Sequence, residues 1–175
     1  QMSSPILSLV VPCYNEEEVL PMAADILKQK LTSLILQEKI STKSFICFVD
    51  DGSSDNTWAI ISDLHEGDNI FTGIKLSRNR GHQNAVLAGL MTAKESADAV
   101  ISLDADLQDD VNAIDEMIEK YAEGCQIVFG VRASRAKDSF FKRFTAESFY
   151  TLLRFFSDDP KSVIFNHADY RLMSK

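Results

Sequence analysis

Five short apolar runs alternate with segments of helical spacing, and this alternation limits the folds that the chain can adopt. The runs cover residues 6–12, 44–51, 70–76, 99–106 and 126–131. Each is rich in Val, Ile, Leu or Phe and has the length of a strand that is buried on both faces. Buried strands that alternate with helices predict an α/β fold, with a mostly parallel central sheet and helices on both of its faces.

Apolar residues at intervals of three and four predict the helices between these strands. The expected helices cover residues 19–34, 58–64, 83–94, 111–121 and 139–156. The chain has 175 residues, without internal repeats and without a linker rich in Pro, Gly or Ser. Residues 1–175 are therefore expected to form a single domain with a sizeable core.

Polar and charged residues follow every one of the predicted strands. These strand ends read, in chain order, PCYNEEE, DDGSSD, SRNRGHQN, DADLQDD and GVRASR. In open parallel sheets, ligands bind beyond the carboxyl ends of the strands, which meet along one edge. One polar strand end is common, but five of them at one edge predict a functional site.

Charge and motif content exclude several classes of function. The formal net charge is −8, whereas a protein that binds nucleic acid broadly needs a basic face. The patterns GxxxxGK[ST] and GxG are both missing, which disfavours a P-loop nucleotidase and a dinucleotide-dependent dehydrogenase. The three histidines are scattered without the spacing of a zinc site.

Cysteine content and hydropathy bear on the location of the protein. Cys13, Cys47 and Cys125 form no CxxC pair and lie in or beside apolar runs. We therefore expect small buried thiols in a reduced, cytoplasmic protein. No apolar stretch approaches the roughly 20 residues that cross a bilayer.

The segment SLDADLQDD, residues 102–110, places four carboxylates at the end of a predicted strand. Side chains alternate along a strand, so Asp104 and Asp106 could point to one side while Ala105 points to the other. Two carboxylates this close repel each other unless a hard cation lies beside them. With an amide oxygen from Gln108, they suit Mg²⁺ or Mn²⁺ with several waters. The alternative is an acidic turn that leads into the next helix.

A basic segment follows the fifth predicted strand. Between residues 132 and 143 the chain carries five basic residues and one acid, against its overall negative charge. An anionic ligand would explain this reversal, and the alternative is the solvated start of a helix. Tyr14, Glu16 and Asp51 follow the first two strands and could contact a base or ribose, but turn and helix-cap roles account for such segments equally well.

Six motifs, taken in order, resemble those of family-2 inverting glycosyltransferases with the GT-A fold. They are VVPCYNEEE, FVDDGSSDNT, LSRNRGHQNAVLAGL, SLDADLQDD, GVRASR and NHADYRLMS. The sequence is most similar to the branch that includes dolichyl-phosphate mannosyltransferase and the bacterial polyprenyl-phosphate glycosyltransferases. The resemblance extends over residues 6–175, and six modest motifs in one order are together specific.

The resemblance implies a role for individual residues of this chain. The positions that match the nucleotide-sugar pocket are Pro12, Tyr14, Glu16, Val49, Asp51, Asp104, Ala105 and Asp106. The positions that match the metal site are Asp104, Asp106 and Gln108, with Mg²⁺ or Mn²⁺ as the ion. Arg132 and, more weakly, Arg135 match phosphate contacts, and Arg171 matches an acceptor contact. The implied catalytic residues are Asp106, Arg132 and Asp169.

The reaction that the resemblance implies moves a sugar from a nucleotide-sugar donor to a polyprenyl phosphate, with inversion at the anomeric carbon. The stretch NRGHQNAVLAGL is more similar to the bacterial enzymes, which favours a UDP-sugar over a GDP-sugar. A lipid phosphate is already ionised and needs cations to position it, whereas a hydroxyl acceptor needs a base such as Asp169. The alternatives are a transferase that extends a cell-wall or surface polysaccharide at a hydroxyl group, and a non-catalytic nucleotide-sugar binding module.

The same branch also implies partners and a location. Its members often continue into an amphipathic helix and transmembrane helices. We therefore expect membrane-associated segments after Lys175 and a full-length protein at the cytoplasmic face of a membrane. The expected partners are a nucleotide-sugar donor, a lipid-phosphate or glycan acceptor and the membrane surface, and nucleic acid is not among them.

Overall fold

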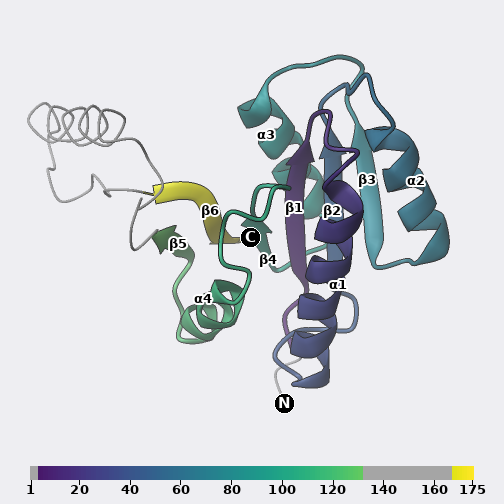
Figure 1. The fold of residues 1–175 in the computed structure, drawn as a ribbon. Coiled ribbons are helices and arrows are strands. Elements are labelled where there is room, and N and C mark those ends of the chain that lie inside the picture. The colour runs from purple at the N-terminus through teal and green to yellow at the C-terminus, as the bar shows by residue number, and fades with distance from the viewer. Residues whose placement is uncertain (1–3, 132–166) are drawn as a thin grey trace, which may run out of the picture.

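The computed structural model describes residues 4–131 and 167–175, and these residues build a six-stranded sheet flanked by helices (Figure 1). The strands are β1 (Leu7–Cys13), β2 (Phe45–Asp50), β3 (Phe71–Lys75), β4 (Ala99–Ser102), β5 (Ile127–Val131) and β6 (His167–Ser174). They lie in the order β3-β2-β1-β4-β6-β5. The pairs β1–β2, β1–β4 and β2–β3 are parallel, whereas β6 runs antiparallel to both β4 and β5.

Helices cover both faces of this sheet, which confirms the predicted α/β class. They are α1 (Leu20–Leu36), α2 (Thr57–Gly67), α3 (His82–Ala93) and α4 (Ala113–Ala122). One core cluster joins the strands to α1, α2 and α4, and a smaller one joins Val10, Val49 and Val100 to α3 on the other face. The helix expected over residues 139–156 lies outside the described residues. Within the described part, no helix combines the length and apolar character needed to cross a membrane.

Helix α3 lies close against the sheet because of one glycine. A Cβ atom on Gly89 would overlap the side chain of Val10 and would lie 2.9 Å from Cγ2 of Val49. A larger residue would therefore push the helix away from the strands, since a packed interior has little free space. Gly89 thus fixes the distance between α3 and the sheet.

The fourth strand ends earlier than the sequence predicts. β4 stops at Ser102, and Leu103 makes one further backbone bond to β1 at 3.1 Å. The chain then turns, with a positive φ of 51° at Leu107. Asp104 and Asp106 therefore lie in a turn, and the alternation of a strand does not set the directions of their carboxylates.

Strand β6 is not predicted by the sequence, although it lies inside the sheet between β4 and β5. Its buried apolar side chains in the described part are Tyr170 and Leu172, which are too few to stand out as an apolar run. Arg171 lies between them and pairs with Ser102 of β4 and Phe129 of β5. The strand thus brings a distant charged residue to the end of β4.

The cysteines differ in exposure. Cys13 and Cys47 are buried, and burial raises the pKa of the Cys47 thiol to about 11. Cys125 is exposed, so the expectation of a buried thiol is wrong at this position. The reason is local, because Cys125 directly follows Gly124, where the chain turns with a φ of 100° between α4 and β5.

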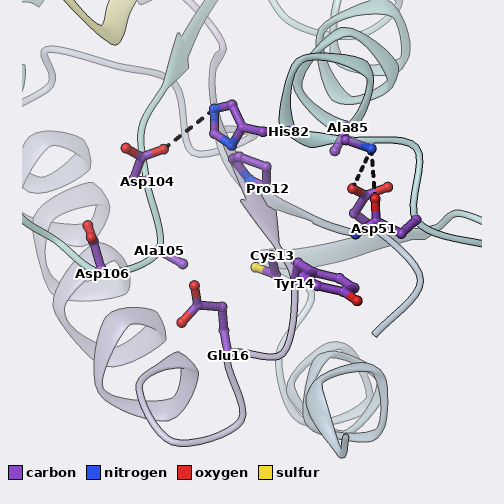
Figure 2. Close-up of a pocket in the computed structure, with 12 residues that line it drawn as sticks. Pro12, Cys13, Tyr14, Glu16, Asp51, His82, Ala85, Asp104, Ala105 and Asp106 are labelled. Atoms are coloured by element: carbon purple, nitrogen blue, oxygen red, sulfur yellow. Dashed lines mark hydrogen bonds and ion pairs between the residues drawn. The ribbon is translucent and has the colours of Figure 1, made fainter. Parts of the chain in front are cut away.

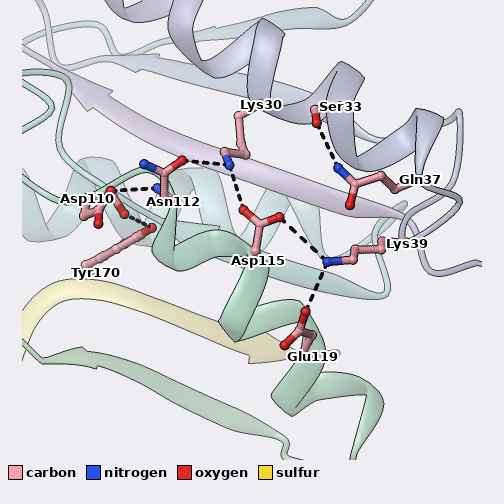
Figure 3. Close-up of polar contacts among 9 residues, drawn as sticks. All are labelled: Lys30, Ser33, Gln37, Lys39, Asp110, Asn112, Asp115, Glu119 and Tyr170. Carbon is pink, nitrogen blue, oxygen red and sulfur yellow. Dashed lines mark hydrogen bonds and ion pairs between the residues drawn. The ribbon is translucent and has the colours of Figure 1, made fainter.

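Polar contacts hold the start of α4 against its neighbours (Figure 3). Nζ of Lys30 in α1 donates to Oδ2 of Asp115 at 2.7 Å and to Oδ1 of Asn112 at 3.1 Å. The hydroxyl of Tyr170 in β6 donates to the backbone carbonyl of Asp110 at 3.0 Å. These contacts fix the far end of the loop that joins β4 to α4, and this loop carries the acidic motif.

Candidate active site

A pocket of about 310 Å³ lies beyond the carboxyl ends of β1, β2 and β4 and beside the start of α3 (Figure 2). Its lining residues are Pro12, Cys13, Tyr14, Glu16, Asp51, Asn79, Gly81, His82, Ala85, Asp104, Ala105 and Asp106. Every residue predicted for the nucleotide-sugar pocket except Val49 is among them. The pocket also occupies the edge of the sheet where folds of this type bind ligands.

The pocket continues the face of the sheet that packs against α3. Val10 and Val49 lie on that face, and side chains alternate along a strand, so Pro12 and Asp51 emerge on the same side two residues later. Val49 itself is fully buried beneath α3 and does not line the pocket. Val49, which the resemblance places at the nucleotide-sugar pocket, is therefore not among the residues that line it.

Hydrogen bonds fasten the loop after β1 to the loop after β2. The backbone N–H of Asn15 donates to Oγ of Ser53 at 2.9 Å, and Oδ1 of Asn15 accepts the N–H of Ser54 at 2.8 Å. The N–H of Glu16 donates to Oγ1 of Thr57 at 2.8 Å. Asn15 thus joins two loops instead of capping a helix, and these bonds hold Glu16 at the pocket wall.

Carboxylates dominate the charge of the pocket. Burial raises the pKa of the Glu16 carboxyl, and neighbouring charges raise it further. In decreasing order of effect, these charges belong to Asp106, Asp55 and Asp104. Among the described residues, the twelve that line the pocket include no lysine and no arginine. This part of the wall therefore suits a ligand that arrives with a cation, because its carboxylates would repel a bare anion.

His82, the first residue of α3, faces the acidic turn. Its Nε2 lies 3.7 Å from Oδ1 of Asp104 (Figure 2). The start of the helix adds the partial positive charge of the helix dipole to the same wall. His82 and its neighbours in the lining, Asn79, Gly81 and Ala85, are not among the predicted site residues. The polar strand end SRNRGHQN is the feature of the sequence that points to them.

The acidic turn offers ligands that suit Mg²⁺ or Mn²⁺. Asp104 and Asp106 place hard carboxylate oxygens on the pocket wall. Within the described residues, no group of three His, Cys, Asp or Glu side chains is placed to hold an ion alone. An ion here would take its other ligands from water and substrate phosphates, as Mg²⁺ commonly does. Gln108 is exposed and outside the lining, and its backbone N–H donates to Oδ1 of Asp106 at 3.1 Å.

Asp51 uses both of its carboxylate oxygens within the protein. Oδ1 accepts the backbone N–H of Arg80 at 2.7 Å, and Oδ2 accepts that of Gly81 at 2.9 Å. The residue is only 2% exposed, although it contributes to the pocket lining. The sequence predicts a contact between Asp51 and the nucleotide but contains no sign of these two bonds.

The predicted acceptor residues lie on β6 or outside the described part of the chain. Arg171 pairs with Ser102, so β6 brings it beside the start of the acidic turn. Its Nε is buried and has no hydrogen-bond partner among the described residues. Asp169 belongs to the same strand, whereas Arg132 and Arg135 fall outside the described residues.

Sequence comparison finds relatives along nearly the whole chain. The uncharacterized glycosyltransferase YkoT of Bacillus subtilis (strain 168) is 50% identical over 175 residues, which are 100% of this chain and 51% of that protein. The bactoprenol glucosyl transferase of Shigella phage SfV is 40% identical over 169 residues, 97% of this chain and 52% of that protein. The chain thus spans about half the length of these relatives.

Comparison of structures finds the same architecture, and a family profile defines the group. The mannosyltransferase PcManGT from Pyrobaculum calidifontis, in complex with GDP-Man and Mn2+, superposes with a TM-score of 0.61 at 21% identity, over 99% of this chain and 45% of that one. At this identity the likeness concerns the fold, and it confirms the expected GT-A architecture. The profile of Glycosyl transferase family 2 matches residues 8–175, and the chain belongs to this family.

Proposed function

We propose that this chain is the catalytic part of a metal-dependent, inverting glycosyltransferase that moves a sugar from a UDP-sugar to a polyprenyl phosphate. The observation that carries this proposal is the position of Asp104 and Asp106 in one pocket with Tyr14 and Glu16. A nucleotide sugar with a bound cation matches such a pocket. Its base suits an apolar or aromatic wall, and its cation suits the acidic wall.

The donor nucleotide is proposed to lie between Tyr14 and the acidic turn. Tyr14 is 48% exposed, so part of its aromatic side chain is available to a base. Pro12 adds apolar surface, and the carboxylate of Glu16 can accept a hydrogen bond from a ribose hydroxyl. The preference for UDP rests on the resemblance of the stretch NRGHQNAVLAGL to bacterial enzymes, whereas the solved structure at 21% identity contains GDP-Man.

The nucleoside diphosphate is the leaving group of this reaction, and the negative charge that it gains must be stabilised. A bound Mg²⁺ or Mn²⁺ ion supplies positive charge to that leaving group. Asp104 and Asp106 would hold the ion, and His82 beside them can donate a hydrogen bond to a phosphate oxygen. The acceptor oxygen then attacks the anomeric carbon on the face opposite the leaving group, and this geometry inverts the carbon.

Two observations favour a polyprenyl phosphate as the acceptor. Relatives at 40% identity are named bactoprenol glucosyl transferases, and bactoprenol is a polyprenyl lipid. A phosphate monoester has a second pKa of about 6, so at neutral pH it needs a cation more than it needs a base. Arg171, whose Nε has no partner in the described part, lies beside the acidic turn and can supply that cation. The resemblance to the family implies Arg132 as a second cation and Asp169 as a further residue near the acceptor.

A lipid acceptor would also place the reaction at a membrane. Polyprenyl chains partition into the bilayer, so only the phosphate head can reach a pocket of this kind. We therefore propose that the full-length protein works at the cytoplasmic membrane surface.

A thermal-shift panel tests the donor site. UDP-glucose, GDP-mannose and a dTDP-sugar are each added with and without Mn²⁺, and the melting temperature is measured. We expect the UDP-sugar to raise the melting temperature only together with Mn²⁺, because a ligand that binds the native state stabilises it. A shift that does not depend on the metal, or one confined to the GDP-sugar, would contradict the proposed donor site.

A transfer assay tests the acceptor. The full-length protein is incubated with the donor found above, Mn²⁺ and either a polyprenyl monophosphate in detergent micelles or a glycan with free hydroxyl groups. We expect transfer to the lipid phosphate with an inverted anomeric centre. Transfer to the glycan alone would support polysaccharide extension, and metal-dependent binding without any turnover would support a binding module.

A further inference from the structure

The turn after β2 and the loop before α3 meet at the pocket wall, and Asp51 joins them. We name residues 78–81 the pre-α3 loop. Both oxygens of Asp51 accept N–H groups of this loop, at 2.7 and 2.9 Å. Hydrogen bonds to an ionised carboxylate are stronger than those between neutral groups, and burial strengthens them further. A single side chain thus holds the loop at two adjacent points.

Gly52 allows the pre-α3 loop to approach this closely. Its φ is 72°, and a Cβ atom here would lie 2.5 Å from the carbonyl carbon of Arg78 and 2.6 Å from the backbone nitrogen of Asn79. Residues with a side chain rarely adopt such a φ, and backbone atoms cannot yield as a flexible side chain can. The turn and the loop therefore pack backbone against backbone.

Helix α3 has no capping side chain of its own. Its N-cap residue is Gly81, and its first turn contains no acidic residue. A negative charge near the N-terminus of a helix stabilises that terminus. Asp51, in the turn after β2, supplies the charge and accepts the N–H of Gly81. It thereby determines where α3 begins and where His82 and Ala85 stand in the pocket lining.

We propose that Asp51 is a positioning residue, which shapes the nucleotide pocket by anchoring the pre-α3 loop and the start of α3. Each of its oxygens accepts one N–H group of the loop, and a carboxylate has about four acceptor sites, so the anchor persists when a ligand enters the pocket. Loss of this anchor weakens the binding of every nucleotide by a similar factor. The proposal rests on the proposed function for the presence of a nucleotide, but the anchoring itself needs no ligand.

Hydrogen exchange of the ligand-free protein tests the anchoring. The backbone amides of Arg80 and Gly81 are followed in the wild type, in Asp51→Asn and in Asp51→Ala. We expect exchange at the Arg80 amide to rise about tenfold or more in Asp51→Ala, and less in Asp51→Asn, which keeps one acceptor oxygen. The Gly81 amide also donates to Oδ1 of Asn79 at 3.0 Å, so its exchange should rise less. Asp68→Asn is the matched control, because Asp68 also accepts a backbone N–H but does not line the pocket. Unchanged exchange in Asp51→Ala would overturn the proposal.

Nucleotide affinity distinguishes a positioning role of Asp51 from direct recognition of the base by Asp51. Dissociation constants for UDP and GDP are measured for the wild type, Asp51→Asn and Gly52→Ala, well below the melting temperature of each. Gly52→Ala keeps the carboxylate but displaces the loop. We expect both variants to lose affinity, with the ratio of the two constants within about twofold of the wild-type ratio. A loss that is confined to one base in Asp51→Asn, with Gly52→Ala unaffected, would instead show base reading.

The two experiments also separate this proposal from the proposed function. If the wild type binds neither nucleotide, the proposed function fails, and the exchange of the Arg80 and Gly81 amides still decides the anchoring. If nucleotides bind but exchange is unchanged in Asp51→Ala, the positioning role fails alone.

Discussion

The two halves of the sheet are assembled in different ways. In the β3-β2-β1 half, strands that are consecutive in the chain are neighbours in the sheet, and their pairing is parallel. In the β4-β6-β5 half, a strand from residues 167–174 lies antiparallel between two strands that come much earlier in the chain. The pocket lies where these halves meet, with Tyr14 and Asp51 from the first and the acidic turn from the second.

This difference suggests that the two halves of the sheet have different roles. The first half is built from local units whose loops are fastened to one another, which suits the recognition of a nucleotide. The second half places the acidic turn beside Arg171 through long-range pairing, which suits the reacting groups. Substitutions in the two halves should therefore affect different steps, and the predictions below test this separation.

The largest effect is expected from the acidic turn. Asp104→Ala combined with Asp106→Ala should lower sugar transfer by about 1,000-fold or more, since a metal ion contributes several kcal/mol of charge stabilisation to such reactions. The melting temperature of the ligand-free protein should not fall, because both carboxylates add negative charge beside Glu16. Asp110→Asn, in the same loop but outside the lining, is the control. If the double variant transferred sugar at nearly the wild-type rate, the acidic turn would not take part in the reaction.

The next effect concerns the stability of the second half. Leu172 in β6 is fully buried, so Leu172→Ala should lower the free energy of unfolding by about 2 to 5 kcal/mol. Urea denaturation measures this change. Met173→Ala, at a partly exposed position on the same strand, should cost clearly less. Equal losses in the two variants would show that β6 does not pack into the core as a native strand.

A smaller effect on the reaction is expected from Arg171. Arg171→Met should lower kcat for transfer to a polyprenyl phosphate by about 10- to 150-fold, the range for losing a hydrogen bond to a charged group. Donor affinity should remain close to that of the wild type, and Arg171→Lys should recover part of the rate. If donor affinity fell as much as kcat, the result would contradict the proposal that the two halves of the sheet serve different steps.

A still smaller effect is expected from the link between β6 and the acidic loop. Tyr170→Phe removes the hydroxyl that donates to the carbonyl of Asp110, so the free energy of unfolding should fall by about 1 kcal/mol. Chemical denaturation again gives the value. The metal concentration needed for half-maximal transfer should also rise, because the loop is less firmly held. No change in either quantity would mean that this bond does not position the loop.

The smallest effect concerns pH and comes from Glu16. Burial and neighbouring carboxylates raise its pKa, so the folded protein disfavours the charged form. Above the raised pKa this lowers stability, and Glu16→Gln should therefore raise the melting temperature slightly at neutral pH. As the pH falls below the raised pKa the difference should shrink, and it should vanish below the ordinary pKa of a glutamate, where Glu16 is protonated in both the folded and the unfolded state. An equal difference at acidic and neutral pH would contradict the electrostatic cause.

Local patterns explain what the sequence could predict. The first three strands and the pocket residues Pro12, Tyr14 and Asp51 follow from buried apolar runs with polar ends, since parallel strand ends share one edge. The acidic motif could be placed in the site for the same reason. Its conformation could not, because the turn after Ser102 depends on the positive φ of Leu107.

Contacts between distant segments explain what the sequence could not predict. Arg171 reaches the acidic turn only through the pairing of β6 with β4, across about 70 residues of chain. The anchoring of the pre-α3 loop by Asp51 likewise joins two separate strand ends. Val49 shares a sheet face with Asp51, but the position of α3, which the sequence does not reveal, leaves Val49 in the core.

The place of β6 also affects how the protein can fold while it is being synthesised. Among the described strands, β6 leaves the ribosome last, and yet β5 has it as its neighbour in the sheet. Until residues 167–174 emerge, the nascent chain carries an open edge on β4 and an unpaired β5, both of which can pair with other chains. A pause in translation shortly before this segment would lengthen that exposed period and favour aggregation, whereas a pause after it would not.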